Sequence, residues 1–134
     1  GVLFATVWVK IDVIAPTPAA NFTMAYHAVD SCVGWFVEFA ITNTGSITWQ
    51  SVKVTVKDLI TIVTVTSTAD TFENWNGCLV GTSQQDLISG EGGYSNGGSF
   101  GYDPTGNNLE ATIIVCSQNG MGGTCLTKTL TFTP

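Results

Sequence analysis

The chain has 134 residues, of which 44% are hydrophobic and only 10% are charged, with a net charge of −6 and no arginine. This length suits a single domain. Four lysines against ten acids argue against binding to nucleic acid or to an anionic membrane surface, because both need clustered cations. No run approaches about 20 consecutive apolar residues, so we expect no membrane insertion.

The first segment has the strongest strand pattern in the chain. It alternates with period two, which predicts an extended strand with one apolar face. Prolines 16 and 18 should then break the ladder, because proline removes a backbone donor. We expect residues 1–15 to form an N-terminal strand, which is a candidate donor strand. Residues 16–21 should be a Pro/Ala linker, and residues 22–134 the folded domain. The apolar face that would anchor an assembly strand consists of Leu3, Ala5, Val7, Val9, Ile11 and Val13.

Two interpretations of this segment are open. In one, it is the domain's own first strand, which switches sheets at a proline kink. In the other, it leaves its domain and completes a sheet of a neighbouring molecule, with main-chain hydrogen bonds and alternating apolar anchors. A head-to-tail contact of that kind does not close on itself and grows a filament. We favour the second interpretation.

The middle of the chain is predicted as strands. Val33, Trp35, Val37, Phe39 and Ile41 should share one buried face, and Val52, Val54 and Val56 another. Residues 43–46 should form a turn, in which Gly45 is free to take a positive φ. The expected strands are 22–30, 33–43, 47–56 and 59–66.

From residue 67 to residue 108 the pattern weakens, and glycine is frequent. We expect long loops there, with short strands near 77–81 and 98–102. Alternation returns at 109–116 and 125–133, on either side of a glycine-rich turn. The whole pattern predicts an all-β sandwich of about seven to nine strands with an N-terminal extended strand.

The four cysteines indicate disulfides rather than a zinc site. They lie at Cys32, Cys78, Cys116 and Cys125, with no CxxC spacing and a single histidine in the chain. Three pairings are open. The glycine-rich turn favours Cys116–Cys125 and therefore Cys32–Cys78. Disulfides imply an oxidising, extracellular setting, and the alternative is four free thiols in a cytosolic domain.

The sequon at Asn21, Asn-Phe-Thr, is the only glycosylation acceptor in the chain and agrees weakly with an extracellular setting.

Residues 39–58 carry a recognisable motif. An apolar strand leads into Asn43-Thr44-Gly45, and the strand that follows has Val52, Val54, Val56 and Asp58 at alternate positions. This resembles the Ig-like modules of bacterial and archaeal surface proteins, the CARDB type among them. Leu87, Gly90 and Glu91 resemble the turn that such modules place before their last strands. The resemblance implies an Ig-like sandwich that serves outside the cell as a spacer, adhesive or assembly unit. The order of apolar extension, linker and sandwich also resembles the layout of donor-strand-exchange fibre subunits.

Catalytic chemistry finds little support in the sequence. His27 is the only imidazole, and Asp30 and Ser31 near it form no nucleophile motif. Glu38 and Glu110 are interpreted as the polar faces of their strands. We therefore expect no enzyme activity.

Ligand sites are weaker hypotheses, and we expect no cofactor. Calcium is an alternative because the segment 103–110 supplies oxygen ligands, although it is equally a good turn sequence. Trp35 is assigned to the core, and Trp49 is left open. The calcium candidates are Asp103, Asn107, Asn108 and Glu110, and the aromatic candidates for a glycan site are Trp75, Tyr94 and Tyr102.

The sequence thus predicts an extracellular or cell-surface structural protein. Its expected partners are copies of itself in a head-to-tail filament that grows through residues 2–14. The alternatives are a monomeric module that binds carbohydrate or protein, and a spacer domain of a larger surface protein.

Overall fold

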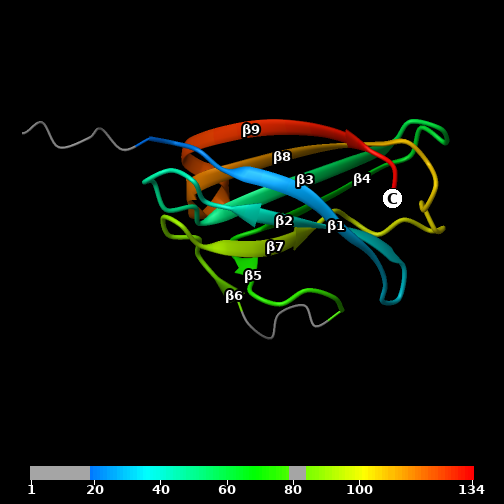
Figure 1. The fold of residues 1–134 in the computed structure, drawn as a ribbon, viewed down its shortest axis with the longest axis horizontal. Coiled ribbons are helices and arrows are strands. Elements are labelled where there is room, and N and C mark those ends of the chain that lie inside the picture. The colour runs from blue at the N-terminus through cyan, green and yellow to red at the C-terminus, as the bar shows by residue number, and fades with distance from the viewer. Residues whose placement is uncertain (1–18, 79–83) are drawn as a thin grey trace, which may run out of the picture.

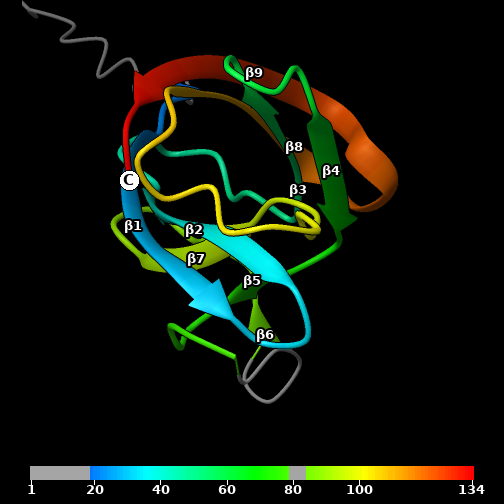
Figure 2. The ribbon, with the colours of Figure 1, turned by 90° about the vertical axis from the view of Figure 1, so that its right-hand side faces the viewer.

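The computed structural model describes residues 19–78 and 84–134 of the chain. Two antiparallel sheets pack face to face, as Figures 1 and 2 show. One sheet has the strand order β1-β2-β7-β5-β6 and the other has the order β4-β3-β8-β9. The predicted all-β sandwich is therefore confirmed. The strands are β1 (Thr23–Ser31), β2 (Trp35–Thr42), β3 (Ser51–Asp58), β4 (Thr64–Ala69), β5 (Phe72–Glu73), β6 (Gln84–Gln85), β7 (Gly92–Asn96), β8 (Leu109–Gln118) and β9 (Gly122–Phe132).

The core lies between the two sheets. Alternate residues of each long strand point into it, because neighbouring side chains of a strand face opposite sides. Trp49, which the sequence left open, is fully buried, and its Nε1 donates to the carbonyl of Asn21. Trp35 packs against the core while remaining half-buried. The fully buried apolar side chains include Val37, Phe39, Ile41, Val54, Val56, Phe72, Leu87, Phe100, Leu109, Ile113 and Val115.

The predicted core position of Val33 is wrong. Val33 lies in the turn between β1 and β2 and is fully exposed, with φ 100°. The β2 strand begins only at Trp35, because the chain reverses through Val33 and Gly34. Gly34 has φ 137°, and a Cβ there would lie 2.0 Å from Ser99 Oγ. The strand predicted from the alternation thus begins two residues too early, at Val33 instead of Trp35.

The predicted strand at 59–66 is also wrong in its first half. The Asp58 carboxylate accepts hydrogen bonds from the backbone N–H groups of Ile60 (2.8 Å) and Thr61 (3.1 Å), which ends β3 in a turn. Ile62 then takes φ 65°, a left-handed conformation that is unusual for a β-branched residue. β4 starts only at Thr64, so the apolar run at 59–63 is a loop.

The region from 67 to 108 holds strands that the sequence did not reveal. β5, β6 and β7 are short and lack alternation. Gly93 is needed in β7 because a Cβ there would lie 3.0 to 3.2 Å from Leu87, Glu73 and Phe72. The expected strand at 98–102 is reduced to a single bridge between Phe100 and Trp35. The expected strand at 77–81 lies partly outside the described residues.

Gly45 is required for a different reason from the one predicted. Its φ is not positive, but a Cβ on it would lie 2.1 Å from the carbonyl oxygen of Ala19. Ser46 N–H donates to that same carbonyl at 2.9 Å. Ala19, four residues before β1, is therefore pressed against the β2–β3 loop, and only glycine leaves room for it.

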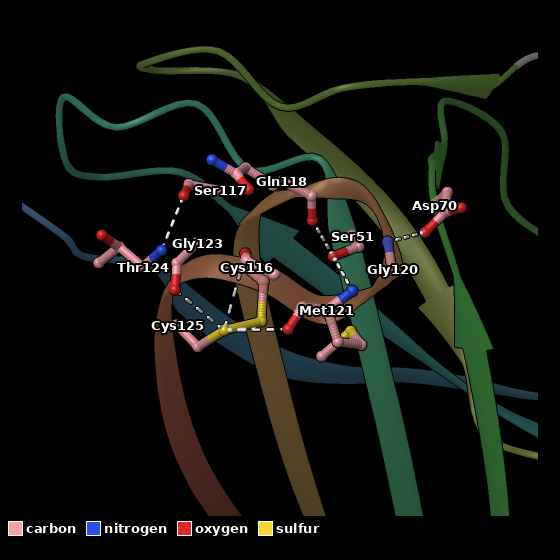
Figure 3. The surroundings of a disulfide bond; sticks show 11 residues. Ser51, Asp70, Cys116, Ser117, Gln118, Gly120, Met121, Gly123, Thr124 and Cys125 are labelled. Carbon is pink, nitrogen blue, oxygen red and sulfur yellow. Dashed lines mark hydrogen bonds between the residues drawn. A yellow bond between two sulfur atoms is a disulfide. The ribbon is translucent and has the colours of Figure 1, made fainter.

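Both favoured disulfides are confirmed, Cys32–Cys78 and Cys116–Cys125. The second joins facing residues of β8 and β9 near their turn (Figure 3). Ser51 Oγ donates to the carbonyl of Gln118 (2.6 Å) and accepts from Met121 N–H (3.2 Å), which ties this turn to the start of β3. Among the described residues no helix is long and apolar enough to cross a membrane.

Candidate assembly interface

β1 and β9 are neighbouring sheet edges. Within the described part of the chain, β1 pairs only with β2, and β9 pairs only with β8. Lys128 Nζ of β9 donates to the carbonyl of Phe22, and the rings of Tyr26 and Phe132 stack with centroids 5.1 Å apart. Residue numbers rise together along both strands, so β1 and β9 run in the same direction (Figure 1). We call the space between these two edges the seam.

The seam has an apolar lining. From Leu126 to Phe132, alternate residues of β9 are half-buried and those between them are exposed, whereas residues 123–125 are all exposed. A depression of about 240 Å³ opens between the first residues of β1 and the middle of β9, and Met24 and Leu130 line it. The half-buried apolar residues of the two edges that pack against the core are Met24, Tyr26, Val29, Leu126 and Phe132.

Lys128 bridges the seam near the start of β1. Besides the bond to Phe22, its Nζ lies 3.2 Å from Asn21 Oδ1 and 5.2 Å from the centroid of the Phe22 ring. Asn21 is exposed, and its Oδ1 also accepts from Phe22 N–H at 3.0 Å. The sequon asparagine therefore lies at one end of the seam. Its glycosylation, which would occur on Nδ2, stays a prediction.

The residues predicted to form the assembly strand (Leu3, Ala5, Val7, Val9, Ile11 and Val13) lie outside the described residues.

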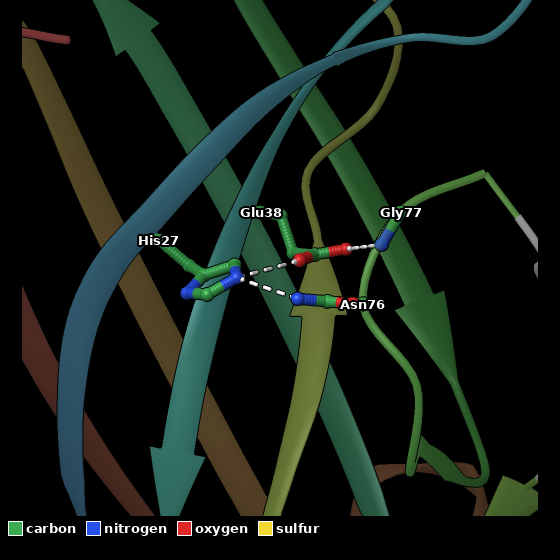
Figure 4. Close-up of polar contacts among 4 residues, drawn as sticks. All are labelled: His27, Glu38, Asn76 and Gly77. Atoms are coloured by element: carbon green, nitrogen blue, oxygen red, sulfur yellow. Dashed lines mark hydrogen bonds and ion pairs between the residues drawn. The ribbon is translucent and has the colours of Figure 1, made fainter.

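A second, polar site, which the sequence did not predict, lies midway along β1 and β2, where His27 and Glu38 face each other (Figure 4). A β-bulge in β1 at His27 interrupts the register with β2. His27 Nε2 lies 3.8 Å from Glu38 Oε1 and 3.0 Å from Asn76 Nδ2. Glu38 Oε2 accepts from the N–H of Gly77 at 2.9 Å. Glu38 is only 2% exposed, and none of the described residues forms a hydrogen bond with its Oε1.

Burial raises the pKa of Glu38 to about 7. The Gly77 N–H opposes this rise, and the nearby carboxyl of Asp30 adds to it through its charge and a hydrogen bond. Glu38 does lie on the face of its strand that points away from the core, as interpreted, but the sequence did not predict that its side chain is buried there. The strand does point Glu38 outward, but the loop at 74–78 covers it, and the Cys32–Cys78 disulfide joins the end of that loop to the β1–β2 turn. Only the disulfide prediction carried a signal for this site.

A third site surrounds Asp58 at the end of β3. Its Oδ2 accepts from Tyr102 Oη (2.8 Å) and Asn107 Nδ2 (2.7 Å), and its Oδ1 accepts from two backbone N–H groups of the following turn. Burial alone would raise the pKa of Asp58, but these four hydrogen bonds outweigh it and lower the pKa to about 2. Asp58 therefore fixes the β3–β4 turn and the 102–107 loop together.

Two of the four predicted calcium ligands, Asn107 and Asp103, are used for other contacts. The Asn107 side chain donates to Asp58, and Asp103 Oδ1 accepts from Thr105 N–H at 3.0 Å, as in an ordinary Asx turn. Glu110 lies in β8 opposite Lys57, and Asn108 is exposed. In the ranges 19–78 and 84–134, no group of three or more His, Cys, Asp or Glu side chains is placed to hold a metal ion.

The three aromatic candidates occupy separate places. Trp75 is 53% exposed in the loop after β5. The Tyr94 ring lies against His27, with centroids 5.0 Å apart. Tyr102 belongs to the Asp58 network and packs on Phe100. These residues do not form one continuous platform.

No family model, curated protein or solved structure matches this chain.

Proposed function

We propose that this protein is the structural subunit of an extracellular filament, in which residues 2–14 of one copy lie in the seam of the next. The observation that carries the proposal is the pair of neighbouring edges, β1 and β9, each with one side unpaired in the described structure. Unpaired edges next to half-buried apolar side chains are a template for an added strand.

The dimensions support this assignment. The six apolar anchors of the first segment extend from Leu3 to Val13, which is eleven residues, and β9 also has eleven residues. A strand with alternating apolar side chains suits the alternating lining of β9. Burying six such anchors contributes roughly 10–15 kcal/mol before association costs of several kcal/mol. The contact would therefore be tight.

The two disulfides support the proposed location. A small all-β domain with two disulfides fits an oxidising compartment, and a filament on the cell surface is one such setting.

The test compares the full chain with a variant that lacks residues 1–15, by light scattering and negative-stain electron microscopy. We expect filaments from the full chain and only small particles from the variant. A labelled peptide of residues 1–15 should bind the shortened protein, and Leu130→Asp in the seam should weaken this binding at least tenfold. Filaments from the shortened chain, or monomers from the full chain, would contradict the proposal.

Glycan binding is a second candidate with one observation in its favour. Tyr94 and Asn74 line a depression of about 350 Å³ on the outer face of the sheet. Asn74 directly precedes the exposed Trp75 in the sequence. Calorimetric titration with a panel of oligosaccharides, repeated on Trp75→Ala and Tyr94→Ala, tests it. Affinity that is lost in both variants, from a protein that stays monomeric, would favour this function over assembly.

A further inference from the structure

The β3–β4 turn presents an apolar tip, residues 59–63, to solvent. Ile60 is 66% exposed, Ile62 is 65% exposed and Val63 is 40% exposed. They are half of the six large hydrophobic side chains that are exposed in the described part of the chain. Exposed apolar side chains that gather in one turn, as these three do, are typical of a contact surface.

The tip is also held rigid. Asp58 accepts hydrogen bonds from the N–H groups of Ile60 and Thr61, and Thr61 Oγ1 is hydrogen-bonded to Tyr102 Oη at 2.5 Å. Ile62 has φ 65°, where asparagine or glycine is favoured and a β-branched residue is strained. An isoleucine at this position therefore lowers the stability of the domain. A contact with another molecule would explain why isoleucine is present there.

The tip and Ala19 lie at opposite ends of the sandwich. Asp58 pairs with Leu109, which pairs with Phe132, so the tip lies where β9 ends. Ala19 lies at the opposite end of the sandwich, on the β2–β3 loop. In Figure 1 the β3–β4 turn lies at the right-hand end with the carboxyl terminus, and the β8–β9 turn lies at the left-hand end.

The direction of an inserted strand decides which ends of two subunits meet. Residues 15–18 connect the donor segment to Ala19, so the end of that segment and Ala19 lie at most about 18 Å apart when the connection is fully extended. A donor that runs antiparallel to β1 and β9 would leave the seam at the Ala19 end and bring two Ala19 ends together. A donor that runs parallel to them leaves at the tip end, and its own domain then sits with its Ala19 end against the tip.

We infer that the apolar tip docks on the Ala19 end of a second copy of this chain, which makes the donor strand parallel to β1 and β9. This inference rests on the proposed function, because it assumes that residues 2–14 occupy the seam of a neighbour. It assigns to Ile60, Ile62 and Val63 the contact that fixes one subunit against the next.

The experiment uses the full chain with Ile60→Thr and Ile62→Asn combined. Asparagine suits the left-handed conformation, so the variant should melt at the same temperature as the parent or higher. We expect its critical concentration for filament growth to rise about tenfold or more, because two buried isoleucines are lost from the contact. Trp75→Gln removes another exposed apolar side chain (53% exposed), from the loop after β5, and serves as the control, which should assemble normally.

A photo-crosslinking amino acid in place of Ile60 gives an independent readout. Crosslinks from the tip to peptides 19–21, 43–50 or 117–122 of another copy support the inference. Crosslinks from tip to tip, or filaments that form without any crosslink, overturn it.

A third variant, Val9→Asp in the donor segment, separates the two proposals. If it abolishes filaments while the tip variant assembles like the parent, the tip inference fails and the proposed function stands. If the Val9→Asp variant also assembles like the parent, both are wrong.

Discussion

Glu38 is the residue whose environment departs furthest from what its position in the sequence indicates. Its folded pKa of about 7 lies above the ordinary value of 4.5. The folded state therefore binds the proton more tightly than the unfolded state does. The resulting stability is present below pH 4.5 and is lost as the pH rises towards 7.

We predict that the free energy of unfolding falls between pH 4.5 and pH 8, with a contribution from Glu38 on the order of 3 kcal/mol. Glu38→Gln should remove that contribution and make the protein more stable than the parent at pH 8. Urea denaturation at a series of pH values measures this. Glu110→Gln, on the facing sheet, is the control and should keep the slope of the parent. An unchanged slope in Glu38→Gln would refute the assignment.

The contribution of Asp58 to stability changes with pH in the opposite direction. Its folded pKa of about 2 lies below the ordinary value of 3.8, so its contribution to stability is full above pH 3.8 and is lost as the pH falls towards 2. Asp58→Ala leaves four donors without their acceptor and should cost about 2–4 kcal/mol. Thermal melting at pH 7 tests this, with Asp103→Ala as control, since Asp103 is exposed and holds only its own turn.

At the scale of elements, the sequence was informative where alternation and burial coincide. Val52, Val54 and Val56 are buried as predicted, and Asp58, which ends the motif, ends the strand in the structure. The apolar run at 59–63 misled because period and composition do not report that one carboxylate folds the chain into a turn. The seam depends on which sheet edges the topology leaves unpaired, and no local sequence pattern carries that information.

The two disulfides should differ in their effect on stability. Cys32–Cys78 closes a segment with a sequence separation of 46, and Cys116–Cys125 one of 9. By chain entropy, their removal should cost about 4 and about 3 kcal/mol respectively. Denaturation of the paired Cys→Ser variants measures both values.

Loss of Cys32–Cys78 should have a further effect that loss of Cys116–Cys125 lacks. It frees the loop over Glu38, so the pH dependence between 4.5 and 7 should shrink in that variant alone. Equal pH dependence of stability in the two variants would show that this loop is not what buries Glu38.

At the scale of the whole molecule, the net charge of −6 opposes association of identical subunits. Both the seam and the tip are mainly apolar, so added salt should screen the repulsion without weakening the contact. We predict that filament growth is faster at 0.5 M than at 0.02 M sodium chloride, as followed by light scattering. Slower growth at high salt would indicate that ion pairs dominate the interface.

The place of the carboxyl terminus has a practical consequence. The carbonyl of Pro134 accepts a hydrogen bond from Gly106 N–H at 3.0 Å, in the loop that Asn107 joins to Asp58. Any residues that follow Pro134, including a purification tag, therefore emerge beside the apolar tip. In the proposed filament, a bulky fusion there should stop growth, because it would cover the surface that is proposed to bind the next subunit.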